Sequence, residues 1–336
     1  MKANAVTSVT EKTGVAMIAV SADDAGMRLD RFLKRHLPGL PMGLIHKLLR
    51  TGQVRLDGAR VKGDRRLDVG NLVRIPPVRP TVLPLGGISE TPPAAMVKAL
   101  EGSVLLQGDG FMVINKPSGW PVHGGSGQAV GLIDGLRYLW PLSQGKLELC
   151  HRLDRDTSGC LLLATQRQTA STLTAAFRDG LMHKTYLALV KGCPSPPQGR
   201  INVPLTKGII RSGERMVIAD HSGQAARTHY RLLERLGRAS LLEVTLETGR
   251  THQVRAHLQA LGHPVVGDDK YGDREFNRVM KKMGMKRLFL HARALTFPHP
   301  KTGVPVMVTA PMDSSLTGVI DQCREKLSNR LKDNSF

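Results

Sequence analysis

The stretch HRLDRDTSGCLLLA, residues 151–164, joins the densest polar cluster of the chain to an apolar run. A continuous apolar run from Cys160 to Ala164 is typical of a buried strand, so the polar residues before it form a loop at the mouth of that strand. Gly159 has no Cβ and lets the backbone turn sharply into the strand. Catalytic groups are often carried by loops that a rigid scaffold positions. The stretch therefore indicates either a candidate active site or a surface loop in which Arg and Asp neighbours neutralise one another.

The sequence around this loop alternates between the periods of strands and helices. Strand-like runs lie at 111–114, 161–164, 186–190, 241–246 and 306–310, and helical stretches lie at 171–179 and 251–261. We therefore predict an α+β domain over residues 101–318. A C-terminal tail over 319–336 is expected to begin as a short amphipathic helix and to end as a polar, frayed segment.

A second pattern occupies residues 22–78. Two sets of apolar residues recur at helical spacing, and they are Leu29, Phe32, Leu33 and Leu37, then Leu44, Ile45, Leu48 and Leu49. A turn at Asp57-Gly58 and an alternating run at 72–75 indicate short strands. We predict a compact unit of two helices and strands here, after a flexible tail over 1–21 that contains one possible strand at 16–20. Residues 79–100 contain four prolines and read as an extended linker.

The charge of the chain indicates a polyanionic partner. It has 48 Lys and Arg residues against 28 Asp and Glu residues, a formal net charge of +20. Lys and Arg that neutralise phosphates release condensed counterions, which makes nucleic acid the usual partner of such a chain. The alternative is a merely soluble basic protein. Residues 22–78 alone carry a net charge of +6.

Cysteine and histidine spacing favours neither a metal site nor disulfides. The four cysteines are widely spaced without a C-x-x-C pair. His252 and His257 are five residues apart and would not share one face of a straight helix. Asp268, Asp269 and Asp273 read more simply as part of a turn than as a Mg²⁺ site. The apolar run 15–20 is too short for a signal sequence or a membrane span, so we expect a cytoplasmic protein without metal or cofactor.

The nine residues HRLDRDTSG at 151–159 resemble the signature motif of the HRLD-motif family of RNA pseudouridine synthases. The resemblance continues through NKPSGWPVHGGSG (115–127), KTYLALVKG (184–192), TGRTHQVRAHLQALGHPVVGDDKYGDREF (248–276) and LFLHARALTFPHP (288–300). Residues 28–76 resemble the S4 RNA-binding domain. The resemblance implies a small S4-like domain followed by a larger mixed-sheet catalytic domain, acting on large-subunit ribosomal RNA. It also implies RNA contacts from a basic set in the first domain, namely Arg31, Lys34, Arg35, Lys47 and Arg50. The oligomeric state is open from the sequence, with a monomer as the default expectation.

The resemblance also implies the roles of individual residues. Asp154 matches the catalytic carboxylate of the family, which either attacks C1′ or removes a ribose proton. Arg255 is the expected ion-pair partner of this carboxylate, and Arg250 is the alternative. Tyr186 is expected to stack on the uracil. Arg152 is expected to fill the gap that the flipped base leaves.

Two other classes of function remain open from the residues alone. The first is a catalytically silent RNA-binding or ribosome-assembly factor on the same fold. The second is a nucleoside or glycoside hydrolase that uses Asp154 and Asp156, which would release free base whereas an isomerase releases nothing.

Overall fold

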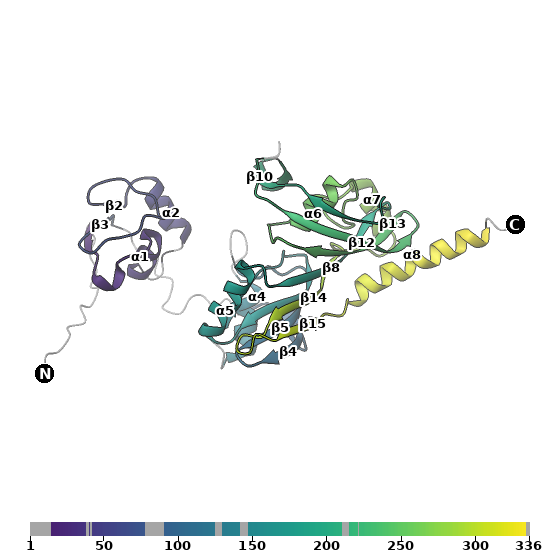
Figure 1. Ribbon diagram of the computed structural model, residues 1–336, viewed down its shortest axis with the longest axis horizontal. Helices are drawn as coiled ribbons and strands as arrows, with labels where there is room; N and C mark the ends of the chain where they lie inside the picture. Colours follow the sequence, from purple (N-terminus) through teal and green to yellow (C-terminus); the bar gives the residue numbers. More distant parts are fainter. Residues whose placement is uncertain are drawn as a thin grey trace. The chain divides into compact units, whose positions relative to one another are not determined.

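The structure is a computed structural model that describes residues 15–37, 40, 42–77, 91–124, 130–141, 147–209, 215–220 and 222–333. The chain forms two compact units, Met1–Ser89 and Glu90–Phe336 (Figure 1). Among the described residues, no helix combines the length and the apolar character that crossing a membrane requires.

The first unit packs two helices against a small sheet. Its elements are β1 (Ala16–Ala19), the 3-10 turn η1 (Ala22–Asp24), α1 (Leu29–His36), α2 (Met42–Arg50), β2 (Arg55–Leu56) and β3 (Leu72–Ile75). The antiparallel sheet has the order β1-β3-β2. Phe32 and Leu33 of α1, Ile45 of α2 and Val73 of β3 meet in one buried cluster, because helical and strand spacing both direct them inward. The predicted pair of helices and the strand at 72–75 are confirmed.

A ten-stranded mixed sheet forms the centre of the second unit. Its path is β4 (Val104–Gly108), β5 (Phe111–Lys116), β7 (Ser158–Ala164), β14 (Leu290–Pro298), β8 (His183–Lys191), β13 (Ala239–Leu246), β12 (Arg227–Leu236) and β9 (Gln198–Asn202). β15 (Pro305–Thr309) pairs with β14, and β6 (Glu148–Leu149) pairs with β7. β14 runs parallel to β7, whereas the other pairs in this sheet are antiparallel. β10 (Leu205–Ile209) and β11 (Arg215–Ala219) form a separate hairpin.

Helices cover both faces of this sheet, so successive side chains of its central strands are buried on opposite faces. Leu161 and Leu163 of β7 pack with α3 (Ala94–Leu100), α4 (Leu132–Leu139) and α6 (Gln253–Ala260). Leu162, between them, packs on the opposite face with α5 (Arg167–Arg178). Farther along that face, α7 (Arg274–Lys281) and α8 (Ser314–Asp333) cover Leu187 and Leu189 of β8. Burial on both faces explains why these strands read as continuous apolar runs.

The strand expected at 16–20 is present as β1, which pairs with β3. The structure differs from the expected boundaries at two other places, which corrects the prediction. α3 lies inside the expected linker over 79–100, and its Met96 and Leu100 are fully buried in the core of the second unit. α8 extends through the expected tail, and its buried residues belong to the core. Each of these elements contributes few inward side chains, so its apolar pattern is too short to recognise without its packing partner.

Candidate active site

The polar loop 151–157 leads into β7 at the place where β7 runs beside β14. Ser158 and Gly159 face His291 and Ala292 of β14 in the parallel register. Gly159 has a φ of +110°, and a Cβ there would lie 2.3 Å from the Ala292 carbonyl oxygen. The position therefore needs glycine because the neighbouring backbone approaches closely, in addition to the backbone freedom that the sequence indicates.

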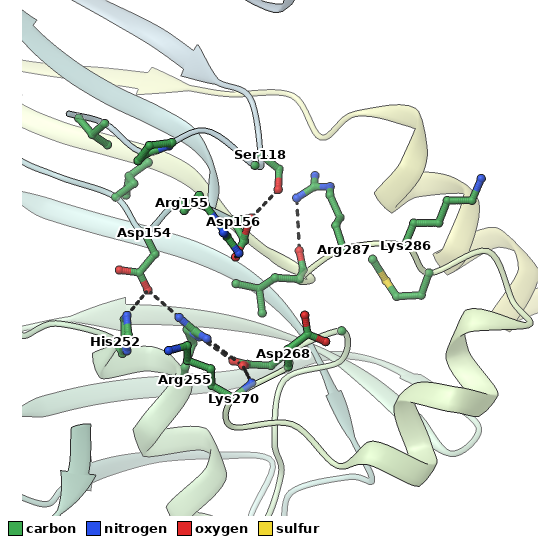
Figure 2. Close-up of a pocket in the computed structure, with 18 of the residues that line it drawn as sticks. Ser118, Asp154, Arg155, Asp156, His252, Arg255, Asp268, Lys270, Lys286 and Arg287 are labelled. Carbon is green, nitrogen blue, oxygen red and sulfur yellow. Dashed lines mark hydrogen bonds and ion pairs between the residues drawn. The ribbon is translucent and has the colours of Figure 1, made fainter. Parts of the chain in front are cut away.

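Residues of the motif 115–119 fix this loop through its backbone. The buried Lys116 ammonium donates to the carbonyl oxygens of Pro117 at 2.9 Å and Arg155 at 2.8 Å. Ser118 Oγ donates to the Asp156 carbonyl oxygen at 2.7 Å (Figure 2). Burial lowers the pKa of Lys116 to about 7, although the charges of Asp156 and Asp154 raise it in part. The sequence analysis quoted this motif without a role for Lys116, because the loop carbonyl that it contacts, that of Arg155, lies 39 residues away in the chain.

The first residue of the HRLD motif is a structural support. His151 Nε2 accepts a hydrogen bond of 2.9 Å from the Leu162 amide, and its ring stacks on Phe177 with 4.6 Å between the ring centroids. Burial lowers the pKa of His151 to about 3, so the ring is neutral. His151 thus anchors the loop to β7 and to α5.

Arg255 joins two carboxylates that lie far apart in the sequence. Its Nη1 donates to Asp154 Oδ2 at 3.2 Å, while Nε and Nη2 donate to Asp268 Oδ2 at 2.6 Å and Oδ1 at 2.8 Å (Figure 2). The Arg255 side chain is 8% exposed, Asp154 is 19% exposed and Asp268 is fully buried. The two-pronged bond to Asp268 orients the planar guanidinium. Its remaining nitrogen then faces the more accessible carboxylate, Asp154.

The pKa shifts follow from this arrangement. Burial would lower the pKa of the Arg255 guanidinium, but the hydrogen bonds and charges of Asp268 and then of Asp154 raise it above its ordinary value. Burial would raise the pKa of Asp268, but Arg255 and the amides of Tyr271 and Lys270 hold it below its ordinary value. Both groups are therefore ionised at neutral pH, and Asp154 has a permanent positive charge beside it.

Two cavities meet at Asp154. The larger, of about 970 Å³, extends past Ser118 to Lys286 and Arg287, and Figure 2 shows these last two side chains away from Asp154. The smaller, of about 570 Å³, is lined by Tyr186 and by residues of the 246–255 segment. The residues that line both cavities are Arg152, Leu153, Asp154, His252 and Arg255. The candidate carboxylate is thus accessible from either side.

The structure brings the candidate residues of the second unit together. Arg152 is exposed and lines both cavities, whereas Tyr186 is buried on β8 and lines the smaller one. Arg250 also lines the smaller cavity, and its Nε donates to the Ala225 carbonyl oxygen at 3.2 Å. Arg255, and not Arg250, contacts Asp154, in agreement with the preferred partner.

The five candidates of the first unit, Arg31, Lys34, Arg35, Lys47 and Arg50, are all exposed. Two of them already have partners within the unit. Lys34 donates to the Leu40 carbonyl oxygen at 2.8 Å, and Arg35 pairs with the buried Asp24 at 2.8 Å. In the described ranges, no group of three or more His, Cys, Asp or Glu side chains is arranged to hold a metal ion.

The fold and this site define an enzyme that places one arginine-paired carboxylate between two cavities, in a chain with a large excess of positive charge. Comparison with known proteins identifies the family. Residues 110–260 match the RNA pseudouridylate synthase family. The chain is 44% identical over 322 residues to ribosomal large subunit pseudouridine synthase C of Escherichia coli (strain K12), covering 95% of this chain and 99% of that protein.

Two further relatives agree. The protein of the same name from Yersinia pestis is 43% identical over 307 residues, covering 91% of this chain and 95% of that protein. The solved structure titled human RNA pseudouridylate synthase domain containing 4 is 29% identical, with a TM-score of 0.56, and covers 68% of this chain and 96% of that one. The chain belongs to the RNA pseudouridylate synthase family and is an RNA pseudouridine synthase.

Proposed function

We propose that this enzyme converts specific uridines of large-subunit ribosomal RNA to pseudouridine in the cytoplasm, with Asp154 as the catalytic carboxylate. The names of its bacterial relatives support this RNA as the substrate. The observation that carries the role of Asp154 is its position at the junction of two cavities, 3.2 Å from a buried arginine that Asp268 holds in place.

The reaction needs a carboxylate that stays ionised and accessible. The C1′–N1 bond of uridine breaks, the uracil turns, and C5 bonds to C1′, so no atom other than the C5 proton is exchanged. Asp154 either attacks C1′ to form a glycosyl ester or removes a ribose proton. Both routes begin from the anion, which the Arg255 charge stabilises.

The two cavities suggest that the target nucleotide and its flanking nucleotides bind in different places. The smaller cavity, of about 570 Å³, is lined by Tyr186, on which we propose that the flipped uracil stacks at a gain of about 1–3 kcal/mol. Besides Arg255, the cationic side chains that line the larger cavity are Arg152, Arg155, Lys270, Lys281, Lys286 and Arg287. We propose that these cations contact the phosphates of the flanking nucleotides, and that Arg152 fills the gap left by the flipped base.

The first unit is proposed to be an S4-like RNA-binding domain. Its exposed basic side chains support this role, with Arg31, Lys47 and Arg50 available for phosphates while Lys34 and Arg35 also serve the fold. Phosphate contacts would add affinity and orientation without reading sequence. Deleting residues 1–85 is expected to weaken rRNA binding and to flatten its salt dependence, and an unchanged salt slope would argue against this role.

The test is a map of pseudouridines in ribosomal RNA from cells that lack this gene. The cells are complemented with the wild-type chain, with Asp154→Asn, or with Asp321→Asn as a matched control on the exposed surface of α8. We expect the cells that lack the gene to lose pseudouridines at large-subunit sites. Only the wild-type chain and the Asp321→Asn control should restore them. Unchanged rRNA would direct attention to transfer RNA or to a silent binding role, and free uracil in the purified reaction would favour the hydrolase alternative.

A further inference from the structure

His252 has an unusual backbone for a residue with a side chain. Its φ of 53° and ψ of 20° lie in the left-handed region, and Asp57 is the other non-glycine residue of positive φ in the described part of the chain. His252 stands directly before α6, three residues ahead of Arg255. Strained backbone of this kind persists where the surrounding structure holds it, often at functional sites. Here the constraint is visible in the contacts of the ring.

Tyr271 fixes the imidazole of His252. The Tyr271 hydroxyl is buried, accepts a hydrogen bond of 2.9 Å from the Val217 amide, and lies 2.9 Å from His252 Nδ1. Because the hydroxyl already accepts from Val217, its own proton is donated to Nδ1, the acceptor within reach. A proton on Nδ1 would instead leave the buried Tyr271 O–H without an acceptor among the residues that the structure describes. The neutral ring is therefore the tautomer that carries its proton on Nε2.

The Nε2 atom of this ring faces the reaction site. It lies 3.9 Å from Asp154 Oδ2, the contact that Figure 2 marks with a dashed line, and this distance is longer than a hydrogen bond. The side chain is 22% exposed and lines both cavities. Burial lowers the pKa of His252, Asp154 partly opposes this, and Arg255 lowers it further, so the ring is neutral near pH 7. A fixed N–H donor thus points into the space beside the carboxylate, where the two cavities meet.

We propose that His252 is a further substrate-binding residue, whose Nε2–H donates to an oxygen near C1′ of the target uridine, either uracil O2 or ribose O2′. This inference rests on the proposed role of Asp154. A carboxylate that reacts at C1′ or C2′ approaches to about 3–3.5 Å. Ribose O2′ is bonded to C2′, and uracil O2 is bonded to the ring carbon next to N1, so both oxygens lie near the carbon that the carboxylate approaches. A donor on O2 also stabilises the negative charge of the departing uracil.

The test measures single-turnover release of tritium from C5 of uridine in a large-subunit rRNA transcript. His252→Gly removes the ring without new backbone strain, because glycine adopts left-handed φ freely. We expect it to slow turnover by about 10²–10³-fold, the range for removing one donor from developing charge. His252→Gln keeps a side-chain N–H donor and is expected to recover much of the rate. Tyr271→Phe removes the hydroxyl that fixes the proton of His252 on Nε2. We expect this variant to slow turnover less than His252→Gly does.

Controls separate this role from folding and from the proposed function. His299→Ala, in the β14–β15 turn away from both cavities, is expected to react as the wild type does. If Asp154→Asn is inactive while His252→Gly turns over at the wild-type rate, the role of His252 is refuted and that of Asp154 stands. If Asp154→Asn is fully active, the proposed function fails, and the inference about His252 fails with it.

A second measurement distinguishes the two acceptor oxygens. The affinities of the wild type and of His252→Gly are compared for RNA with 2′-deoxyuridine at the target position. A contact to O2′ predicts that the difference between the two proteins disappears with this RNA. A contact to uracil O2 predicts that the difference persists.

Discussion

Asp268→Asn tests how far the candidate site depends on the residue behind it. The carboxylate accepts four hydrogen bonds: Oδ1 from Arg255 Nη2, the Lys270 amide and the Tyr271 amide, and Oδ2 from Arg255 Nε. Asparagine can keep the three bonds at Oδ1. At the other position its amide N–H₂ group faces the Arg255 Nε–H group, so a donor meets a donor.

The expected loss of unfolding free energy follows from the hydrogen bonds that the substitution removes. One hydrogen bond to a charged group is lost, which costs about 1.5–3 kcal/mol. The Arg255 charge also loses a buried counter-charge, and breaking a buried ion pair costs about 3–5 kcal/mol when no partner remains. Since Asp154 still pairs with Arg255, we expect the free energy of unfolding to fall by an amount between these limits, about 2–4 kcal/mol. Turnover should fall as well, because a displacement of about 1 Å can cost about 10²-fold in rate.

Denaturant unfolding followed by tryptophan fluorescence measures the stability change. Both tryptophans, Trp120 and Trp140, pack against the core of the second unit, so their signal reports the unit that contains the site. Asp269→Asn, at the exposed neighbouring position, is the matched stability control, and its free energy of unfolding should change by less than about 0.5 kcal/mol. If Asp268→Asn were as stable and as active as the control, the reasoning that Asp268 orients Arg255 would be wrong.

Three further predictions follow from the same contacts. Gly159→Ala should lower the free energy of unfolding by at least about 1–3 kcal/mol, because its Cβ meets the β14 backbone, and the same fluorescence assay measures this. Tyr186→Ala should raise the activation free energy of single-turnover isomerisation by about 1–3 kcal/mol, because the uracil loses its stacking partner. Tyr186→Phe should keep most of the rate, and equal rates for the two variants would exclude stacking. The pKa of Asp268 is lower in the folded chain than its ordinary value of 3.8, so its contribution to stability is present above that value and is lost as the pH falls below it. The difference in unfolding free energy between the wild type and Asp268→Asn should therefore shrink between pH 5 and pH 3, and a constant difference would contradict the assignment.

Much of the local structure could be predicted from the sequence. The strands around 111–114, 161–164 and 186–190 were recognisable because continuous apolar runs record burial on both faces of the sheet. The helices of the first unit were recognisable because their apolar residues recur at i, i+3 and i+4. The loop at 151–159 was recognisable because its polar residues end abruptly at a strand. α3 and the C-terminal part of α8 were missed, since one or two inward residues per turn do not stand out beside prolines or charges.

The roles of the supporting residues were decided by tertiary structure. Asp268 read as part of a turn, and Tyr271 and Lys116 had no assigned role, because nothing near them in the sequence reveals what they touch. Lys116 contacts a carbonyl 39 residues away, and Arg255 reaches Asp154 across 101 residues. Hydrophobic period and motif spacing are properties of neighbours along the chain, so they determined the elements and the loop that carries Asp154. Hydrogen bonds act over about 3 Å in space. The partners that hold Asp154, Arg255 and His252 in place therefore became known only once the sheet had brought β5, β7, α6 and the 267–271 turn together.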